Sequence, residues 1–387
     1  MAGYSTSVDG DFDRVYMSNS TLFDQFVGTQ LWVCGQNTYG MLGDGTTVNK
    51  SSLVTVAGGG TIWSQVSCSY AIAAVKTDGT LWTWGRDNYG TLGNGTTIDR
   101  SSPVTTAGGG TTWSPIIDLG SYHSSAIKTD GTLWTWGQNT SGKLGDGTTI
   151  DRSSPVTTAG GGTNWRQVAS AGVHHGAAIK TDGTLWTWGQ NLNGQLGDGT
   201  TVSKTSPITT AGGGTNWRQV ACGYYAAAAI KTDGTLWTWG NNTTYGMLGD
   251  GTTLNRSSPI TTVAGGTTWK QVSAAYYSFA AIKTDGTLWT CGYNSNGNLG
   301  DGTILYRSSP VTTAGGGTNW KQISIGRGGA AGIKTDGTLW IWGNNSYGNL
   351  GDGTTLSRSS PATVVSNITT WKSVSYPRYT LAALAQN

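Results

Sequence analysis

The 387-residue sequence contains no glutamate, so all 20 of its acidic residues are aspartates. Charged residues make up only 11% of the chain, whereas glycine occurs 62 times. Chains that are poor in Glu and rich in Gly, Thr, Asn and Trp form helices badly, but they form strands and turns readily. The composition therefore disfavours helical bundles, coiled coils and Rossmann-type α/β folds.

Long apolar runs and clustered cysteines are also missing. No stretch approaches 18 apolar residues, so we expect no transmembrane helix, and the first residues do not resemble a secretory signal. Cys34, Cys68, Cys222 and Cys291 show neither a CxxC pair nor a Cys/His spacing. We expect them to be small buried side chains, not zinc ligands, in a protein made in a reducing cytosol. The evenly spread basic residues give no nucleic-acid signature.

Tryptophan reveals an internal repeat. The 19 tryptophans fall into three registers, and the Leu-Trp-x-x-Gly register recurs at steps of 50 to 52 residues. That register consists of Trp32, Trp82, Trp134, Trp186, Trp237, Trp289 and Trp340. Such self-similarity indicates seven units of one local structure.

Each unit contains four strand candidates, and Thr-Asp-Gly joins two of them as a tight hairpin. Four short antiparallel strands in each of seven units predict an all-β fold, a seven-bladed β-propeller. An open β-solenoid is the alternative. The last unit lacks its LWTWG strand, and residues 29–35 supply it. We therefore expect the N-terminal strand to complete the last blade and close the ring.

The repeated pattern W-G-x-N-x-x-G-x-L-G-x-G is followed by Ser-Ser-Pro-Val and then by a small-residue strand ending in Asp-Gly. Across residues 28–387 this pattern resembles the regulator of chromosome condensation repeat family. The resemblance implies a seven-bladed propeller with this ring closure. Function transfers poorly, because propellers host many activities. Guanine-nucleotide exchange is not favoured, because it needs a specialised loop and we expect uniformly short loops with no insertion in any blade.

An aspartate recurs in the Leu-Gly-Asp-Gly segment, and a basic residue follows it. We predict that these aspartates cap their own turns and form partly exposed ion pairs, because calcium would need more oxygen ligands. Neither a metal nor a cofactor is expected. The aspartates are Asp44, Asp146, Asp198, Asp250, Asp301 and Asp352, with Asn94 in the remaining repeat.

One segment varies sharply between otherwise similar repeats, directly after the Trp-x-Gln-Val strand. Its Tyr, His and Arg side chains are typical of a recognition surface and would suit sugars or peptides. Packing in the central channel or between blades is the alternative interpretation. The candidate binding face consists of Tyr70, Tyr122, His123, His174, His175, Tyr224, Tyr225, Tyr276, Tyr277, Arg327, Tyr376, Arg378 and Tyr379.

A second variable stretch follows each Trp-Gly pair and is short and polar. We expect it to be an ordinary solvated turn, or else a rim of one ring face. Its copies cover residues 36–39, 86–89, 138–141, 190–193, 241–245, 293–296 and 344–347.

Residues 1–27 lie outside the repeats and form an N-terminal extension to the propeller of residues 28–387. The extension is acidic and aromatic, which predicts an arm that lies on its own propeller or docks into another subunit. Its candidate anchors are Tyr4, Phe12, Tyr16, Phe23 and Phe26.

Three functions compete. The first is a phage or virion surface protein, made in the host cytoplasm, anchored to other virion proteins through residues 1–27 and offering its aromatic face to a host-surface glycan or protein. The second is an intracellular protein-binding hub of the regulator of chromosome condensation type. An enzyme comes last, because no carboxylate pair or catalytic triad stands apart from the repeat.

Overall fold

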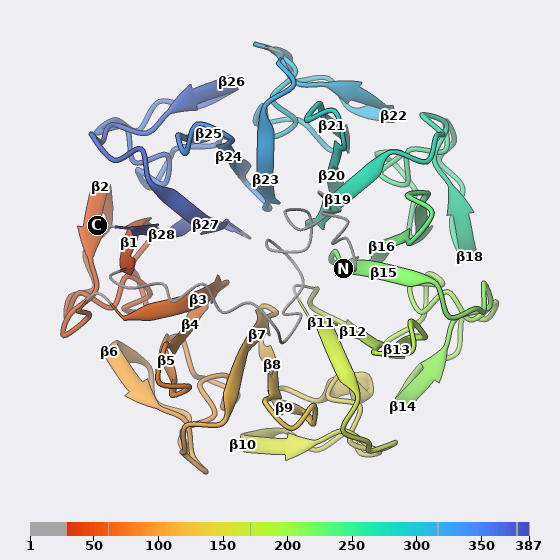
Figure 1. Cartoon of the computed structure of the whole chain (residues 1–387), viewed down its shortest axis with the longest axis horizontal. Helices are drawn as coiled ribbons and strands as arrows, with labels where there is room; N and C mark the ends of the chain where they lie inside the picture. Colours follow the sequence, from red (N-terminus) through yellow and green to blue (C-terminus); the bar gives the residue numbers. More distant parts are fainter. Residues whose placement is uncertain (1–28, 61, 171, 316, 377, 387) are drawn as a thin grey trace, which may run out of the picture.

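The protein forms a ring of seven β-sheets around a central axis (Figure 1). The computed structural model describes residues 29–387 except 61, 171, 316, 377 and 387. Within these residues every sheet has four strands, and all neighbouring strands are antiparallel. The predicted seven-bladed β-propeller is confirmed.

Each blade runs outward from an inner strand at the axis to an outer strand at the rim (Figure 1). The inner strands are β3 (Trp63–Cys68), β7 (Trp113–Leu119), β11 (Trp165–Ala169), β15 (Trp217–Cys222), β19 (Trp269–Ala274), β23 (Trp320–Ile325) and β27 (Trp371–Ser375). The second strands are β4 (Ala71–Lys76), β8 (His123–Lys128), β12 (His175–Lys180), β16 (Ala226–Lys231), β20 (Ser278–Lys283), β24 (Gly329–Lys334) and β28 (Thr380–Gln386).

The third strands carry the Leu-Trp motif, and the outer strands follow them. The third strands are β1 (Thr29–Gly35), β5 (Leu81–Gly85), β9 (Leu133–Gly137), β13 (Leu185–Gly189), β17 (Leu236–Gly240), β21 (Leu288–Gly292) and β25 (Leu339–Gly343). The outer strands are β2 (Lys50–Thr55), β6 (Arg100–Thr105), β10 (Arg152–Thr157), β14 (Lys204–Thr209), β18 (Arg256–Thr261), β22 (Arg307–Thr312) and β26 (Arg358–Thr363). A short 3-10 turn, η1 (Thr140–Gly142), precedes β10.

The two ends of the described chain meet in one blade, whose strand order is β2-β1-β28-β27. Strand β1 pairs with β28 over its whole length, from Thr29 opposite Gln386 to Gly35 opposite Thr380. Each free sheet edge would otherwise expose unpaired backbone groups. The predicted ring closure is therefore confirmed.

The core lies between neighbouring blades, where large and small side chains interdigitate. In the cluster between the blades of β12 and β16, Trp217 and Trp239 pack against Ala227 and Ala229. The small residues of the second strand leave room for these rings. Trp239 is fully buried there, and its indole N–H donates to the carbonyl of Gln195 at 2.9 Å. The four cysteines are buried and free, as expected.

The repeated aspartates stabilise turns at the rim. Asp250 accepts a hydrogen bond from the backbone N–H of Thr252 at 3.0 Å and pairs with Arg256 at 2.7 Å. Equivalent ion pairs form at Asp44, Asp146, Asp301 and Asp352. Asp198 bonds Thr200 instead. The capping prediction is confirmed.

Candidate functional site, an aromatic face of the propeller

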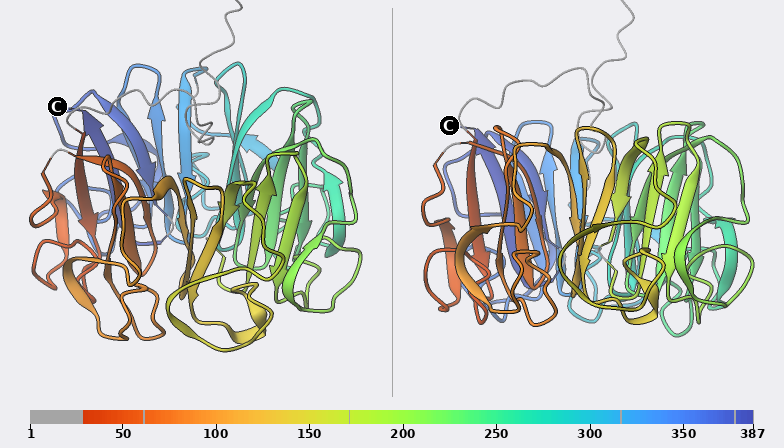
Figure 2. Two further views of the ribbon diagram at one scale, coloured as in Figure 1. Left: turned by 60° about the horizontal axis from the view of Figure 1, so that its bottom comes forward. Right: turned by 90° about the horizontal axis from the view of Figure 1, so that it is seen from below.

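The strands run between two faces of the ring, and loops cover both (Figure 2). We call one of them the aromatic face; it carries the loops that join the first strand to the second and the third to the fourth. The opposite face carries the Thr-Asp-Gly hairpins and the Gly-rich connections between blades. The two loop types of the aromatic face touch, because the backbone N–H of Asn241 donates to the carbonyl of Tyr225 at 2.9 Å.

A glycine makes this close approach possible. Gly240 has a φ of +107°, and a Cβ there would lie 2.5 Å from the carbonyl oxygen of Tyr225. Only glycine combines that backbone conformation with that contact. The glycine that ends the third strand of each blade therefore positions the variable loop beside it.

The structure divides the thirteen residues of the candidate binding face into two groups. His123, His175 and Tyr376 are buried, with at most 1% exposure. The other members are half-buried at the aromatic face: Tyr70, Tyr122, His174, Tyr224, Tyr225, Tyr276, Tyr277, Arg327, Arg378 and Tyr379. The sequence prediction thus included three packing residues.

Strand register explains why the two histidines are buried. His123 and His175 pair with Gly137 and Gly189, the glycines of Trp-Gly in the next strand. Ala226 occupies the same position in the following blade and is also buried. The residue at a fixed spacing before the Trp-Gly glycine therefore points inward. This spacing was the signal in the sequence that could have separated the histidines from the face.

Tyr376 is buried for a different reason. It directly follows the inner strand β27, its backbone N–H donates to the Ser324 hydroxyl at 2.9 Å, and its own hydroxyl accepts a hydrogen bond from the Asn349 side chain. Tyr376 therefore fills the gap between two blades.

Three arginines gather on one side of the aromatic face. We call Arg86, Arg327, Arg378, Tyr70 and Tyr122 the arginine cluster. The Arg378 guanidinium lies 3.9 Å from the Tyr70 ring centre, and Arg86 lies 5.1 Å from the same ring. Tyr70 and Tyr122 stack at 5.6 Å. Arg86 was not among the predicted site residues, although this position carries Gln, Asn or Tyr in the other repeats.

The arginine cluster is cationic and partly desolvated. Burial lowers the pKa of Arg378, and the neighbouring charge of Arg327 acts in the same direction. Burial also raises the pKa of the Tyr70 hydroxyl, so that ring stays neutral. Within the described part of the chain, no ion pair joins these guanidinium groups to a carboxylate. The cluster therefore presents positive charge that the described fold leaves unneutralised.

The remaining side of the face is aromatic and uncharged. Tyr224 and Tyr276 meet edge to face at 4.4 Å, and Tyr225 stacks on Tyr277 at 6.0 Å. Arg327 lies 4.7 Å from the Tyr276 ring, which connects this side to the arginine cluster. The result is one continuous surface of tyrosine.

The second variable stretch belongs to the same surface, so its interpretation as an ordinary solvated turn is wrong at several positions. Tyr39 and Tyr89 contact Tyr70 and Tyr122 at 6.3 and 5.4 Å. These tyrosines are half-buried. At these positions the stretch forms a rim of the ring face, which was the other interpretation of the sequence.

One of these loops is a residue longer than the others, contrary to the expectation of no insertion. The N–H of Leu248 reaches the side chain of Asn242 across six positions, whereas Leu196 reaches Asn191 across five. Thr244, in this loop, has a φ of +78°. A left-handed conformation costs a residue with a Cβ about 1–2 kcal/mol, so the loop geometry is strained.

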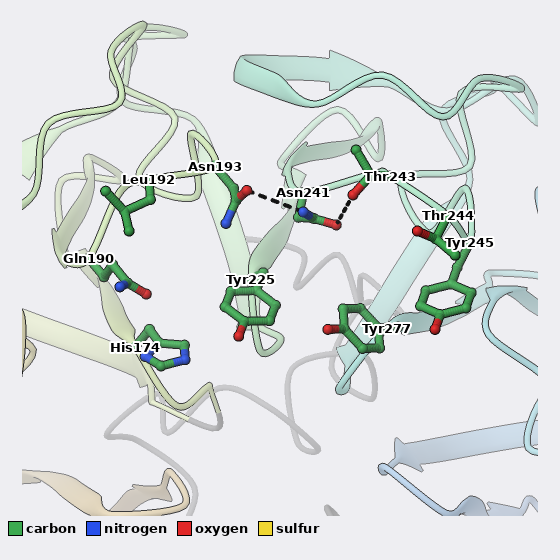
Figure 3. Close-up of a pocket in the computed structure, with 10 residues that line it drawn as sticks. All are labelled: His174, Gln190, Leu192, Asn193, Tyr225, Asn241, Thr243, Thr244, Tyr245 and Tyr277. Carbon is green, nitrogen blue, oxygen red and sulfur yellow. Dashed lines mark hydrogen bonds between the residues drawn. The ribbon is translucent and has the colours of Figure 1, made fainter.

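The longer loop forms one wall of a pocket on the aromatic face (Figure 3). The pocket has a volume of about 390 Å³ and lies over three consecutive blades. Its lining consists of His174, Gln190, Leu192, Asn193, Tyr225, Asn241, Thr243, Thr244, Tyr245 and Tyr277.

Acid–base and metal chemistry find little support in these residues. Burial, aided by the charge of Lys143, lowers the pKa of His174 to about 4, and burial lowers that of His175 to about 3. Both imidazoles are therefore neutral near pH 7. Among the described residues, no group of three or more His, Cys or Asp side chains could hold a metal ion.

The predicted N-terminal anchors, Tyr4, Phe12, Tyr16, Phe23 and Phe26, lie outside the described residues. None of the helices that the structure describes is long and apolar enough to cross a membrane.

A β-propeller built from Trp-Gly repeats is the class that this fold and face define. The family model of the RCC1-like domain matches residues 117–387, and that of the regulator of chromosome condensation (RCC1) repeat matches residues 78–127. The first match covers more than half of the chain. The chain therefore belongs to the RCC1-like domain family.

Individual relatives agree with this assignment. Ultraviolet-B receptor UVR8 of Arabidopsis thaliana is 31% identical over 249 residues, which are 63% of this chain and 56% of the relative. E3 ubiquitin-protein ligase HERC2 of Homo sapiens is 28% identical over 251 residues, which are 63% of this chain and 5% of the relative. The chain thus spans just over half of one relative and a small part of the other.

A solved structure shows the same fold. The crystal structure of Kap60 bound to yeast RCC1 (Prp20) contains a chain that matches with a TM-score of 0.81 at 15% identity. The match covers 100% of this chain and 94% of that chain.

Proposed function

We propose that this chain is a non-enzymatic, protein-binding propeller of the RCC1 type that holds its partner at the aromatic face. The arginine cluster is the observation that carries the proposal. Arginine and tyrosine dominate the binding energy of protein interfaces, and they do so where they are partly desolvated and packed together. Arg378, stacked on Tyr70 with its pKa lowered by burial, meets both conditions.

The charge of the cluster indicates the kind of partner. Its three guanidinium groups need an anionic counterpart, and an arginine fork binds a carboxylate through two parallel hydrogen bonds. We therefore expect an acidic segment of the partner protein to lie against Arg86, Arg327 and Arg378. The flanking tyrosines would supply apolar contact area at a small entropic cost.

Membership of the RCC1-like family favours this role over a virion surface protein. Attachment to a virion through residues 1–27, with a virion location, stays a prediction, because that segment lies outside the described residues. Nucleotide exchange is not proposed, because the described loop insertion amounts to a single residue.

Affinity purification tests the proposal. The full chain, tagged and produced in its native cells, is compared with Arg378→Ala and with the matched control Arg152→Ala. Arg152 lies at the rim, where it pairs with Asp146 at 2.9 Å. We expect Arg378→Ala to weaken retention of a specific protein by about thirtyfold, which corresponds to the loss of about 2 kcal/mol at a hot spot.

Arg152→Ala should retain that protein. The proposal fails if no captured protein depends on Arg378, or if both variants lose it equally. Circular dichroism of each variant shows whether the propeller is intact, so a folding defect is recognised directly.

A further inference from the structure

The pocket beside the longer loop points to a second binding activity. We infer that it is a site for a neutral sugar ring, such as the pyranose of a hexose, held between tyrosine faces and side-chain amides. The inference goes beyond the proposed function, because the site lies outside the arginine cluster and involves a different class of ligand.

The floor of the pocket offers flat apolar surface. Tyr225 and Tyr277 lie side by side with their rings inclined by 29°, and His174 stacks on Tyr225 at 5.1 Å (Figure 3). The C–H face of a pyranose packs well on such rings. The polar tips of Tyr and His remain available at the same time.

The walls offer hydrogen-bonding groups of both kinds. The Asn241 amide donates to the Asn193 side chain at 3.2 Å and accepts from the Thr243 hydroxyl at 3.3 Å (Figure 3). An amide has two donors and two acceptor lone pairs, so each of these groups keeps capacity for a ligand. Gln190 adds a third amide. Amides beside hydroxyls match a ligand whose own hydroxyls both donate and accept.

Among the described residues that line the pocket, none carries a charge near pH 7. Lys143, whose charge acts on His174, is only 2% exposed and donates to Gln138 at 2.6 Å and to the carbonyl of Val173 at 2.9 Å. A ligand carboxylate would lose water here without gaining an ionic partner, and that exchange is unfavourable. The pocket should therefore select a neutral ligand.

One polar atom at the site has no partner in the fold. The Nε2 atom of His174 is buried and makes no hydrogen bond among the described residues. Because this imidazole is neutral near pH 7, one ring nitrogen donates and the other accepts. This nitrogen has almost no solvent-accessible area, so the ligand would meet the ring of His174 and not its Nε2 atom.

The loop beside this pocket is one residue longer than the corresponding loops of the other blades, so the repeat alone does not account for its shape. Thr243 and Thr244 of this loop line the pocket, and Tyr245 lies beside Tyr277 at 4.9 Å and Tyr293 at 5.1 Å. Strained backbone persists where the surrounding structure enforces it, and such strain clusters at ligand sites. The volume of about 390 Å³ falls within the usual range of small-ligand pockets, roughly 300–1,000 Å³.

Saturation-transfer NMR on the full chain tests the inference. The probes are the methyl glycosides of glucose, galactose, mannose and N-acetylglucosamine, with methyl glucuronide as the charged counterpart and N-acetyl-triglycine amide as a neutral peptide. We expect at least one neutral glycoside to bind in the millimolar range. Methyl glucuronide should bind about tenfold more weakly than methyl glucoside, the equivalent of one lost favourable contact.

Two variants locate the binding. Tyr225→Ala should weaken it about tenfold, since it removes the stacking surface. Deletion of Thr244 restores the loop length of the other blades, which fold with the shorter loop, so it should abolish binding while the thermal unfolding transition remains cooperative. Tyr89→Ala, on the far side of the same face, is the matched control and should bind as the original chain does.

Several results would overturn the inference. They are the absence of binding by all four neutral glycosides, equal binding of the glucuronide, or unchanged binding in both pocket variants. Binding of N-acetyl-triglycine amide in place of the sugars would assign the pocket to a peptide instead. Because Arg378 lies outside the pocket, loss of sugar binding and loss of the protein partner are separately observable.

Discussion

The two faces of the propeller are built from the same seven repeats. One face repeats the same side-chain contacts from blade to blade, whereas the other carries different side chains in different blades. On the opposite face, Lys231 lies over the rings of Trp217 and Trp237 at 4.8 and 4.5 Å, and five other blades repeat this arrangement. On the aromatic face, neighbouring blades place different residues at equivalent positions, such as Tyr122 and His174.

In a repeat protein, residues that differ between the repeats are therefore better candidates for function than residues that recur. A contact that recurs in six of the seven blades, such as the bond from the Thr80 N–H to Asp78 at 2.9 Å, serves the blade and needs no ligand to explain it. The arginine cluster and the longer loop at Thr244 each occur once in the described structure. Their chemistry is unneutralised charge and open polar surface, so a partner or ligand completes them.

Truncating a repeated tryptophan should produce the largest effect. Trp217 is 1% exposed and contacts Trp239 at 6.2 Å. We expect Trp217→Ala to lower the free energy of unfolding by about 3–5 kcal/mol, because it leaves a cavity between blades. Tyr225→Ala, at the half-exposed aromatic face, should lower it by only about 1 kcal/mol. Urea unfolding of both variants checks the contrast, and equal losses would show that the tyrosines are core.

The buried histidines should make the stability of the folded protein depend on pH, unlike the alanine at the same position in the next blade. The pKa of His175 is about 3 in the folded protein and about 6.5 when unfolded, so below pH 6.5 the unfolded state binds the proton first. Stability should therefore fall as pH drops from 6.5 towards 3, with about 2 kcal/mol lost by pH 5 through this residue.

His175→Ala places in this blade the residue found at Ala226 in the next one. Its free energy of unfolding should change less between pH 7 and pH 5 than that of the original chain. Denaturant unfolding at the two pH values measures the difference. An identical pH dependence would mean that His175 is not held neutral by burial.

The smallest effect is expected from a single repeated lysine. Lys231→Met keeps an apolar chain over Trp217 and Trp237 but removes the charge. It should lower the free energy of unfolding by about 0.5–1 kcal/mol, the range of a partly exposed cation–π contact. Thermal unfolding measures this shift, and partner retention should not change. A clear loss of the partner would place recognition on the opposite face instead.

Most of the fold could be predicted from the sequence, because the same pattern of residues occurs seven times. The Leu-Trp register gave the blade length, and the strand missing from the last unit gave the ring closure. Side-chain direction in the variable loops was harder to predict. Tyr122 and His123 are adjacent in the sequence and both have polar rings. Only Tyr122 reaches the surface, because the strand register turns the side chain of His123 inward.

The arginine cluster shows a second limit of the sequence. Arg86, Arg327 and Arg378 come from distant repeats and from two different loop types, and only the closed ring brings them around Tyr70. The pocket is lined in part by a loop that is one residue longer than its counterparts. That difference is visible in the sequence as Asn241 to Tyr245, but its backbone strain is not.

Hydrogen exchange of the chain, free and bound to the protein that it captures, tests the central claim most directly. The account predicts slower exchange in the loops of the aromatic face, around Tyr70, Tyr122 and Arg378, with the Thr-Asp-Gly hairpins unchanged. Protection confined to those hairpins, around Asp78 and Asp233, would contradict it and would place recognition on the repeated face.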